Sequence, residues 1–102
     1  MVIVETKLFT ARAIELLSDD EYRALQLELS RQPALGAVIP RTGGLRKLLP
    51  GRGKRGGARV IYFWHVETSR ILMLFIYAKS ERSDLTATQR EALRKVIERE
   101  YP

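Results

Sequence analysis

The sequence predicts an α+β fold in which helices pack on a twisted, mostly antiparallel sheet. Three runs rich in β-branched and other apolar residues follow one another in the second half of the chain. Short polar segments connect them, as is typical of antiparallel pairs. Two helix-start signals of the form Ser/Thr-x-x-Glu/Gln flank this block, one on each side. Because separate helix and strand blocks are typical of α+β domains, we expect one such domain over residues 1–102.

The first half of the chain predicts one strand and two helices. Residues 2–4 (VIV) are a β-branched run that favours a strand, and residues 10–17 fit a short helix. Ser18 and Glu21 form a capping box, which predicts that a second helix begins here. The segment 33–44 contains two prolines and three glycines, so we expect an irregular crossover.

The second half of the chain predicts three strands and one helix. The strands are expected at residues 45–49, 58–64 and 70–77, and the last, apolar almost throughout, is expected to be the central strand. Thr86 and Gln89 form a second capping box, which begins a C-terminal helix. The predicted order is therefore β-α-α-β-β-β-α, with the helices covering one side of the sheet.

Positive charge is concentrated in the middle of the chain. The net charge is +6, from 18 basic and 12 acidic residues, yet no acidic residue lies between Glu28 and Glu67. A concentration of this kind indicates a polyanionic partner. The basic residues of this segment are Arg31, Arg41, Arg46, Lys47, Arg52, Lys54, Arg55 and Arg59.

The glycine-rich segment GRGKRG, residues 51–56, formally matches the dinucleotide motif G-x-G-x-x-G. That motif requires a helix directly after it, whereas a strand is predicted here, and no Ser or Thr follows Lys54 as a Walker A loop requires. The segment is either a hairpin turn with solvated cations or part of a nucleic-acid-binding surface.

Strand alternation favours the nucleic-acid-binding surface. Arg59 is expected to share a sheet face with Ile61 and Phe63, and Arg46 or Lys47 can approach it across the hairpin. One face of the sheet would then carry cations beside aromatic rings that can stack on bases.

Several kinds of chemistry are disfavoured by the composition. The chain has no cysteine and one histidine, His65, so we expect no disulfide, no thiolate nucleophile, no metal site and no cofactor. His65 lies at the end of a predicted strand and is interpreted as a turn or edge residue rather than a catalyst. The N-terminus lacks the long apolar core of a signal peptide, and no apolar run is long enough to cross a membrane. We therefore expect a cytoplasmic protein without a membrane partner.

Four segments together resemble the HigB-like branch of the RelE/ParE superfamily of type II toxins. They are LSDDEYRALQLEL, GAVIPRTGGLRKL, GKRGGARVIYFW and IYAKSERSDLTATQREAL, and the similarity covers residues 17–93. The resemblance implies a RelE-like domain that enters the ribosomal A site and cuts translated mRNA. It also implies a cognate antitoxin, encoded beside it, through which alone the pair would bind operator DNA.

The resemblance implies a metal-independent reaction in which the ribose 2′-OH attacks the adjacent phosphate and leaves a 2′,3′-cyclic phosphate. Arg59 matches an arginine of the family's third strand and would stabilise the phosphorane. Well-studied members carry a further basic residue and a tyrosine where this chain has Ser80 and Thr86, so the proton-transfer groups stay open, with Lys79 and Lys47 as candidates for the base. The residues expected to bind RNA are Arg46, Lys54, Arg55 and Arg82.

Two alternative functions also stay open. A ParE-like protein would inhibit DNA gyrase through a protein interface, without catalysis. A catalytically inactive relative would bind RNA but not cut it.

Overall fold

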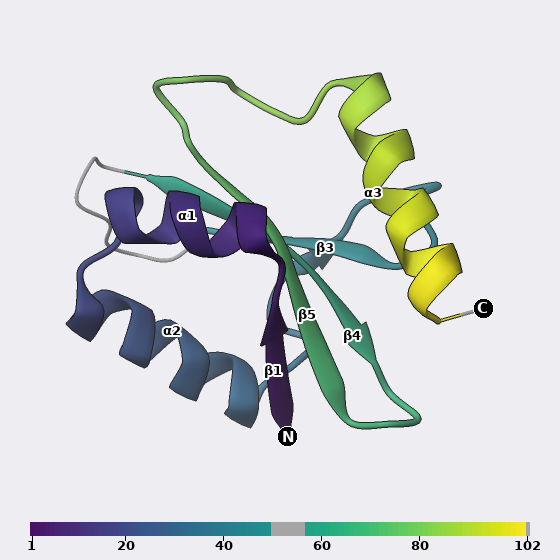
Figure 1. Ribbon diagram of the computed structural model, residues 1–102, viewed down its shortest axis with the longest axis horizontal. Helices are drawn as coiled ribbons and strands as arrows, with labels where there is room; N and C mark the ends of the chain where they lie inside the picture. The colour runs from purple at the N-terminus through teal and green to yellow at the C-terminus, as the bar shows by residue number, and fades with distance from the viewer. Residues whose placement is uncertain (50–56, 102) are drawn as a thin grey trace.

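The computed structural model describes residues 1–49 and 57–101, which form three helices and five strands (Figure 1). This arrangement confirms the predicted α+β class. In chain order the elements are β1 (Val2–Glu5), α1 (Lys7–Leu16), α2 (Asp19–Arg31), β2 (Ala37–Val38), β3 (Leu45–Leu48), β4 (Ala58–His65), β5 (Arg70–Ala78) and α3 (Ala87–Glu100).

The described strands form one sheet in the order β1-β5-β4-β3-β2. The pairs β2–β3, β3–β4 and β4–β5 are antiparallel, as predicted, whereas β1 is parallel to β5. β5 is buried on both faces, but β4 rather than β5 is the middle strand. The register pairs Lys47 with Ile61 and Arg59 with Tyr77, so two of the predicted site residues lie on neighbouring strands.

A bulge in β5 sets which side chains reach each face of the sheet. Ile61 pairs with Phe75 and Tyr62 pairs with Met73, so Leu74 is an extra residue on β5. As a result, Leu74 and Phe75 both point to the same side of the sheet. Beyond the bulge the alternation resumes, and Tyr77 also points to that side.

The helices cover both faces of the sheet, so the expectation that they cover one side was wrong. In Figure 1, α2 lies to the left of the strands and α3 to the right. The reason is that β4 and β5 place apolar side chains on both faces, and each face needs a cover. One core contains Phe9, Leu16, Leu25 and Leu29 of α1 and α2 with Val60, Tyr62 and Met73; the other contains Leu85 and Ile97 with Leu45, Ile61, Leu74 and Tyr77.

Both predicted capping boxes are present. The Ser18 hydroxyl accepts a hydrogen bond from the backbone N–H of Glu21, whose side chain accepts from the Ser18 N–H. Thr86 and Gln89 make the same pair of bonds at the start of α3. Among the described helices, α2 and α3 therefore begin where the sequence predicts.

The other helix and one strand differ from the prediction. α1 begins at Lys7 rather than at residue 10, because Thr6 is its N-cap and accepts a hydrogen bond from the backbone N–H of Phe9 at 3.1 Å. In the predicted crossover, β2 pairs with β3 through two residues. None of the described helices is both long enough and apolar enough to span a membrane.

Candidate nucleic-acid interface

Four of the predicted site residues lie on or beside the sheet face that α3 covers. Lys47 is opposite Ile61 of that face, and Arg59 is opposite Tyr77 of that face. Lys79 and Arg82 follow β5 directly. We call Lys47, Arg59, Lys79 and Arg82 the basic cluster; it draws on β3, β4 and the segment after β5.

Gly57 brings two members of the basic cluster together. Its carbonyl accepts a hydrogen bond from Arg59 Nη1 at 2.9 Å and another from the backbone N–H of Lys79 at 3.0 Å. Gly57 has a φ of +125°, and a Cβ placed on it would lie 3.0 Å from Arg59 Nη1 and 3.6 Å from Lys79 Cβ. Glycine at this position therefore allows the arginine head and the lysine stem to pack against the same backbone.

Arg82 lies over an aromatic surface. Its Cζ atom is 5.8 Å from the centroid of the Phe75 ring, a distance typical of a cation–π contact. The Phe75 ring is in turn 5.9 Å from the Tyr77 ring. This arrangement directs the guanidinium of Arg82 towards the part of the sheet that carries Arg59 and Tyr77.

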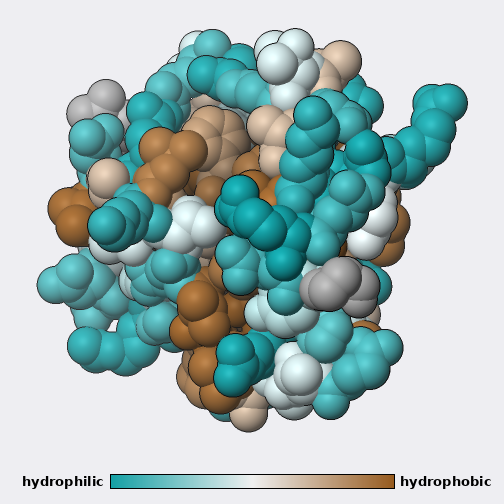
Figure 2. All heavy atoms as spheres, turned by 45° about the vertical axis from the view of Figure 1, so that its right-hand side comes forward, coloured by the Kyte–Doolittle hydropathy of each residue, from teal (hydrophilic) through white to brown (hydrophobic). Residues whose placement is uncertain are grey.

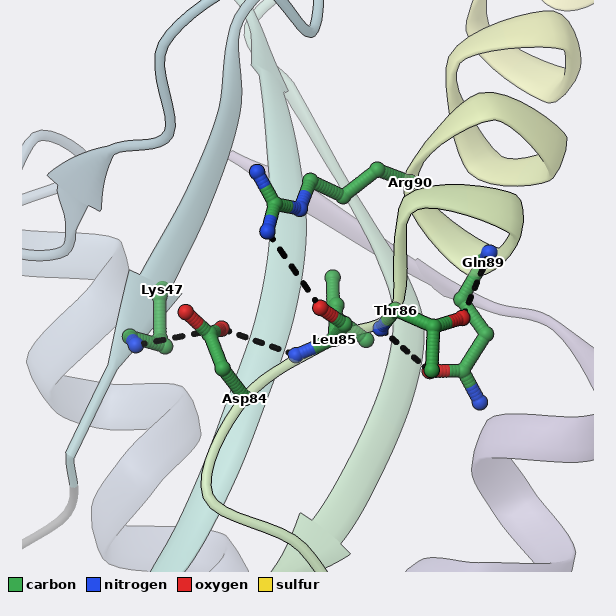
Figure 3. Close-up of polar contacts among 6 residues, drawn as sticks. All are labelled: Lys47, Asp84, Leu85, Thr86, Gln89 and Arg90. Atoms are coloured by element: carbon green, nitrogen blue, oxygen red, sulfur yellow. Dashed lines mark hydrogen bonds and ion pairs between the residues drawn. The ribbon is translucent and has the colours of Figure 1, made fainter.

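Lys47 is paired with an acid. Its Nζ atom lies 3.4 Å from Oδ1 of Asp84, which also accepts a hydrogen bond from the Leu85 backbone N–H at 2.8 Å (Figure 3). The Leu85 N–H and the Lys47 charge hold the pKa of Asp84 below its usual value. Asp84 thus carries a negative charge at neutral pH and opposes part of the positive charge of the cluster.

The segment that carries Asp84 is fixed to its surroundings at several points. Arg90 donates to the Leu85 carbonyl at 3.4 Å, and the Thr86–Gln89 capping box follows immediately (Figure 3). Upstream, Glu81 accepts from the Ala78 backbone N–H at 2.9 Å and pairs with Arg12 of α1. The contact with Arg12 is the main reason why the pKa of Glu81 is lowered.

Tyr77 is a buried residue of this face that was not among the predicted site residues. Its side chain is 0% exposed, and among the described residues its hydroxyl has no hydrogen-bond partner. Burial raises its pKa, as does the charge of Asp84, whereas Arg59 and Arg82 act in the opposite direction. The one signal in the sequence was strand alternation, which can place Tyr77 opposite Arg59 once the register is known.

Arg46 is not part of the basic cluster. It is opposite Tyr62 on the other side of the sheet, where its guanidinium lies 6.0 Å from the centroid of the Trp64 ring. It donates to the backbone carbonyls of Gly36 at 2.8 Å and Ala34 at 3.2 Å. Of the two residues expected to approach Arg59, the structure brings only Lys47 to that face, while Arg46 holds the segment before β2 against β3.

Three of the predicted loop cations, Arg52, Lys54 and Arg55, lie outside the described residues. The RNA-binding roles predicted for Lys54 and Arg55 therefore stay predictions.

His65 is the last residue of β4, where it pairs with Arg70 of β5 beside the turn that connects the two strands. Its Nδ1 lies 2.6 Å from the Thr68 hydroxyl, and its ring stacks on Tyr101 with the centroids 4.3 Å apart. Tyr62 and Trp64 contribute to the core under α1 and α2.

An apolar hollow of about 160 Å³ lies beside the basic cluster. It shares Phe75 with the Arg82 contact and is formed between α1, β5 and α3. Figure 2, which turns the α3 side of Figure 1 forward, shows hydrophobic patches between mostly hydrophilic side chains. Such a hollow offers an apolar surface next to cations. Its lining residues are Leu8, Phe75, Gln89, Ala92 and Leu93.

In the described part of the chain, no group of three or more His, Cys, Asp or Glu side chains could hold a metal ion. No protein-family model matches the chain. The cations of the basic cluster can bind an anion and stabilise negative charge that develops on it.

Proposed function

We propose that this chain is the toxin of a type II toxin–antitoxin system, a RelE-type endoribonuclease that cuts mRNA in the ribosomal A site. The observation that carries the proposal is the basic cluster: Arg59, Lys79 and Arg82 lie together beside Tyr77. Asp84 pairs with the fourth cation, Lys47. A surface of this kind can bind a phosphodiester that is flanked by bases. The sequence resemblance to RelE-type toxins indicates that this phosphodiester belongs to mRNA on the ribosome.

In this proposal, catalysis needs no metal ion. The 2′-OH of the ribose loses its proton and attacks the adjacent phosphorus, the bond to the 5′-oxygen breaks, and that oxygen takes up a proton. Arg59 stabilises the charge of the phosphorane, since a guanidinium can donate two parallel hydrogen bonds to its oxygens. Lys79 is the stronger candidate for the base, because its exposed side chain can reach a bound phosphodiester, whereas Lys47 is held by Asp84.

The partners follow from the same proposal. The protein would act in the cytoplasm on ribosomes that translate mRNA, and a cognate antitoxin would neutralise it by covering the basic cluster or by adding bulk that prevents entry into the A site. Operator DNA would be bound through the antitoxin complex.

Brief expression in bacterial cells, followed by mapping of mRNA 5′ ends, tests this function. We expect growth arrest and new ends within translated regions. The Arg59→Ala variant should lose both, because removal of one donor to a developing oxyanion costs about 100- to 1,000-fold in rate. Arg23→Ala is the matched control: it removes an arginine whose side chain is 79% exposed on α2, and it should behave like the wild-type protein.

The outcome also separates the alternatives. Growth arrest with gyrase-dependent DNA breaks and intact mRNA would indicate a ParE-like inhibitor. Ribosome or RNA binding without new mRNA ends would indicate an inactive relative. Full toxicity of a folded Arg59→Ala protein would remove Arg59 from the mechanism.

A further inference from the structure

Two tyrosines on neighbouring strands are fully buried but differ in their hydrogen bonding. Tyr62 on β4 and Tyr77 on β5 are both 0% exposed. The Tyr62 hydroxyl donates to the Pro33 carbonyl at 2.7 Å and accepts from the Gly36 backbone N–H at 2.8 Å. Among the described residues the Tyr77 hydroxyl has no partner at all. A buried hydroxyl without a partner is unfavourable, so such a group calls for a physical explanation.

A second buried donor without a partner lies in the same region. Within the described part of the chain, Nε of Arg82 is buried and makes no hydrogen bond, and the guanidinium lies over Phe75, the ring that packs against Tyr77. The charge of Arg82, like that of Arg59, acts on the Tyr77 hydroxyl. The region therefore combines two unused hydrogen-bond donors with two positive charges.

The ligand that matches this combination is an oxyanion. The Tyr77 hydroxyl is protonated at neutral pH, since burial raises its pKa above the already high value of a tyrosine, and it can therefore donate a hydrogen bond. Guanidinium groups bind phosphate oxygens through several donors at once. A phosphodiester offers two non-bridging oxygens that carry the negative charge, and these can accept from a hydroxyl and from two guanidinium groups.

We propose that Tyr77, Arg59 and Arg82 form a phosphodiester-binding subsite in which the Tyr77 hydroxyl donates to a non-bridging phosphate oxygen. The proposal deepens the proposed function and rests on it for the choice of RNA as the ligand. In this subsite the phosphate must reach the buried Tyr77 hydroxyl, and the guanidinium of Arg82 leaves the Phe75 ring to bind the same phosphate. Tyr77 then positions the phosphate that Arg59 stabilises.

Binding of a short single-stranded RNA tests the subsite. The RNA carries a fluorophore and 2′-O-methyl riboses, so that it cannot be cut by attack of a 2′-OH, and fluorescence anisotropy at low salt gives the Kd. Tyr77→Phe removes only the hydroxyl and keeps the ring that packs in the core. We expect its Kd to rise about tenfold, the typical effect of losing a hydrogen bond to a charged group. Its Tm should be unchanged or higher, because the lost hydroxyl makes no hydrogen bond to the residues that the structure describes.

Tyr62→Phe is the matched control, because it removes a buried hydroxyl that makes two hydrogen bonds. Its Tm should fall while its Kd stays at the wild-type value. A purely structural role for Tyr77 predicts the reverse for Tyr77→Phe: a lower Tm and unchanged affinity. Wild-type affinity of a folded Tyr77→Phe protein, or no RNA binding by the wild-type protein, would overturn the subsite.

The subsite and the proposed function can fail separately. If the wild-type protein cuts no mRNA but its RNA binding depends on the Tyr77 hydroxyl, the subsite holds and the toxin function does not. If mRNA is cut equally well by the wild-type protein and by Tyr77→Phe, and their RNA affinities are equal, the function holds and the subsite does not.

Discussion

Asp84 determines how much of the positive charge of the basic cluster is available to a ligand. Its carboxylate lies 3.4 Å from Lys47 Nζ, and the two side chains are 53% and 27% exposed. An ion pair so accessible to water adds little to folding stability. In the proposed function its main effect is on binding, because an RNA phosphate would compete with Asp84 for Lys47.

Asp84→Asn should therefore strengthen RNA binding. The amide oxygen of asparagine can still accept from the Leu85 backbone N–H, but it no longer neutralises Lys47. We expect a lower Kd and a steeper dependence of log Kd on log salt, by about one additional counterion released. Anisotropy titrations at several salt concentrations measure both.

Asp20→Asn is the matched control for Asp84→Asn. Asp20 is 94% exposed at the start of α2 and lies 3.8 Å from Arg23, so its replacement changes the net charge by the same amount away from the basic cluster. Equal effects of the two variants would mean that net charge alone sets the affinity, and that the Lys47–Asp84 pair has no special role.

At the level of residues, strand alternation predicted part of the site. It correctly placed Arg59 on one face with Ile61 and Phe63. It could not decide between Arg46 and Lys47, because that choice depends on the register of β3 against β4. The sequence also could not show that the Tyr77 hydroxyl lacks a hydrogen-bond partner among the described residues, because a missing hydrogen bond is a property of the tertiary structure.

The segment between β5 and α3 is the element that positions half of the basic cluster. It carries Lys79 and Arg82, and Glu81 fastens its beginning by accepting from the Ala78 backbone N–H and by pairing with Arg12 of α1. Because Arg12 belongs to a helix on the other side of the sheet, this contact links the α1 side of the protein to the cluster.

Glu81→Gln should weaken the contact with Arg12 and lower the stability of the fold by an amount that depends on pH. The pKa of Glu81 is lowered in the folded protein, mainly by Arg12, so its carboxylate stabilises the fold above the pKa of the unfolded chain, and this contribution is lost as the pH falls through the lowered folded-state pKa. We expect a slightly lower Tm than wild type at pH 7 and a difference that shrinks in acid. Thermal unfolding measured over a pH series shows this.

Glu15→Gln provides the comparison for Glu81→Gln. It removes an exposed carboxylate from α1, the helix that carries Arg12. If both variants lose the same stability, or if the effect of Glu81→Gln does not depend on pH, the contact with Arg12 does not fasten the segment.

At the level of elements, the sequence predicted the features that depend on residues close together in the chain. The capping boxes located the starts of α2 and α3 because their hydrogen bonds involve residues three apart in the chain. The two-residue strand β2 was missed because pairing with β3, rather than its own composition, makes it a strand. The parallel pairing of β1 with β5 was missed for the same reason, since their partners are distant in sequence.

In the whole molecule, the apolar core under α1 and α2 and the basic cluster lie on opposite faces of the sheet. α1 and α2 cover one face of the sheet with a large apolar core, and the basic cluster lies with α3 on the other face. The sequence predicted the helix and strand content but not this two-sided arrangement, which follows from the apolar residues on both faces of β4 and β5. In the proposed function, the face that α3 covers cuts mRNA on the ribosome.

A reaction of purified protein with translating ribosomes and a defined mRNA tests this function. Primer extension locates the cuts, and analysis of the new ends identifies the attacking group. We predict cuts within the reading frame only when the ribosomes translate, with 2′,3′-cyclic phosphate and 5′-OH ends, and no cuts by Arg59→Ala. Intact mRNA in the presence of folded wild-type protein and translating ribosomes would contradict the account.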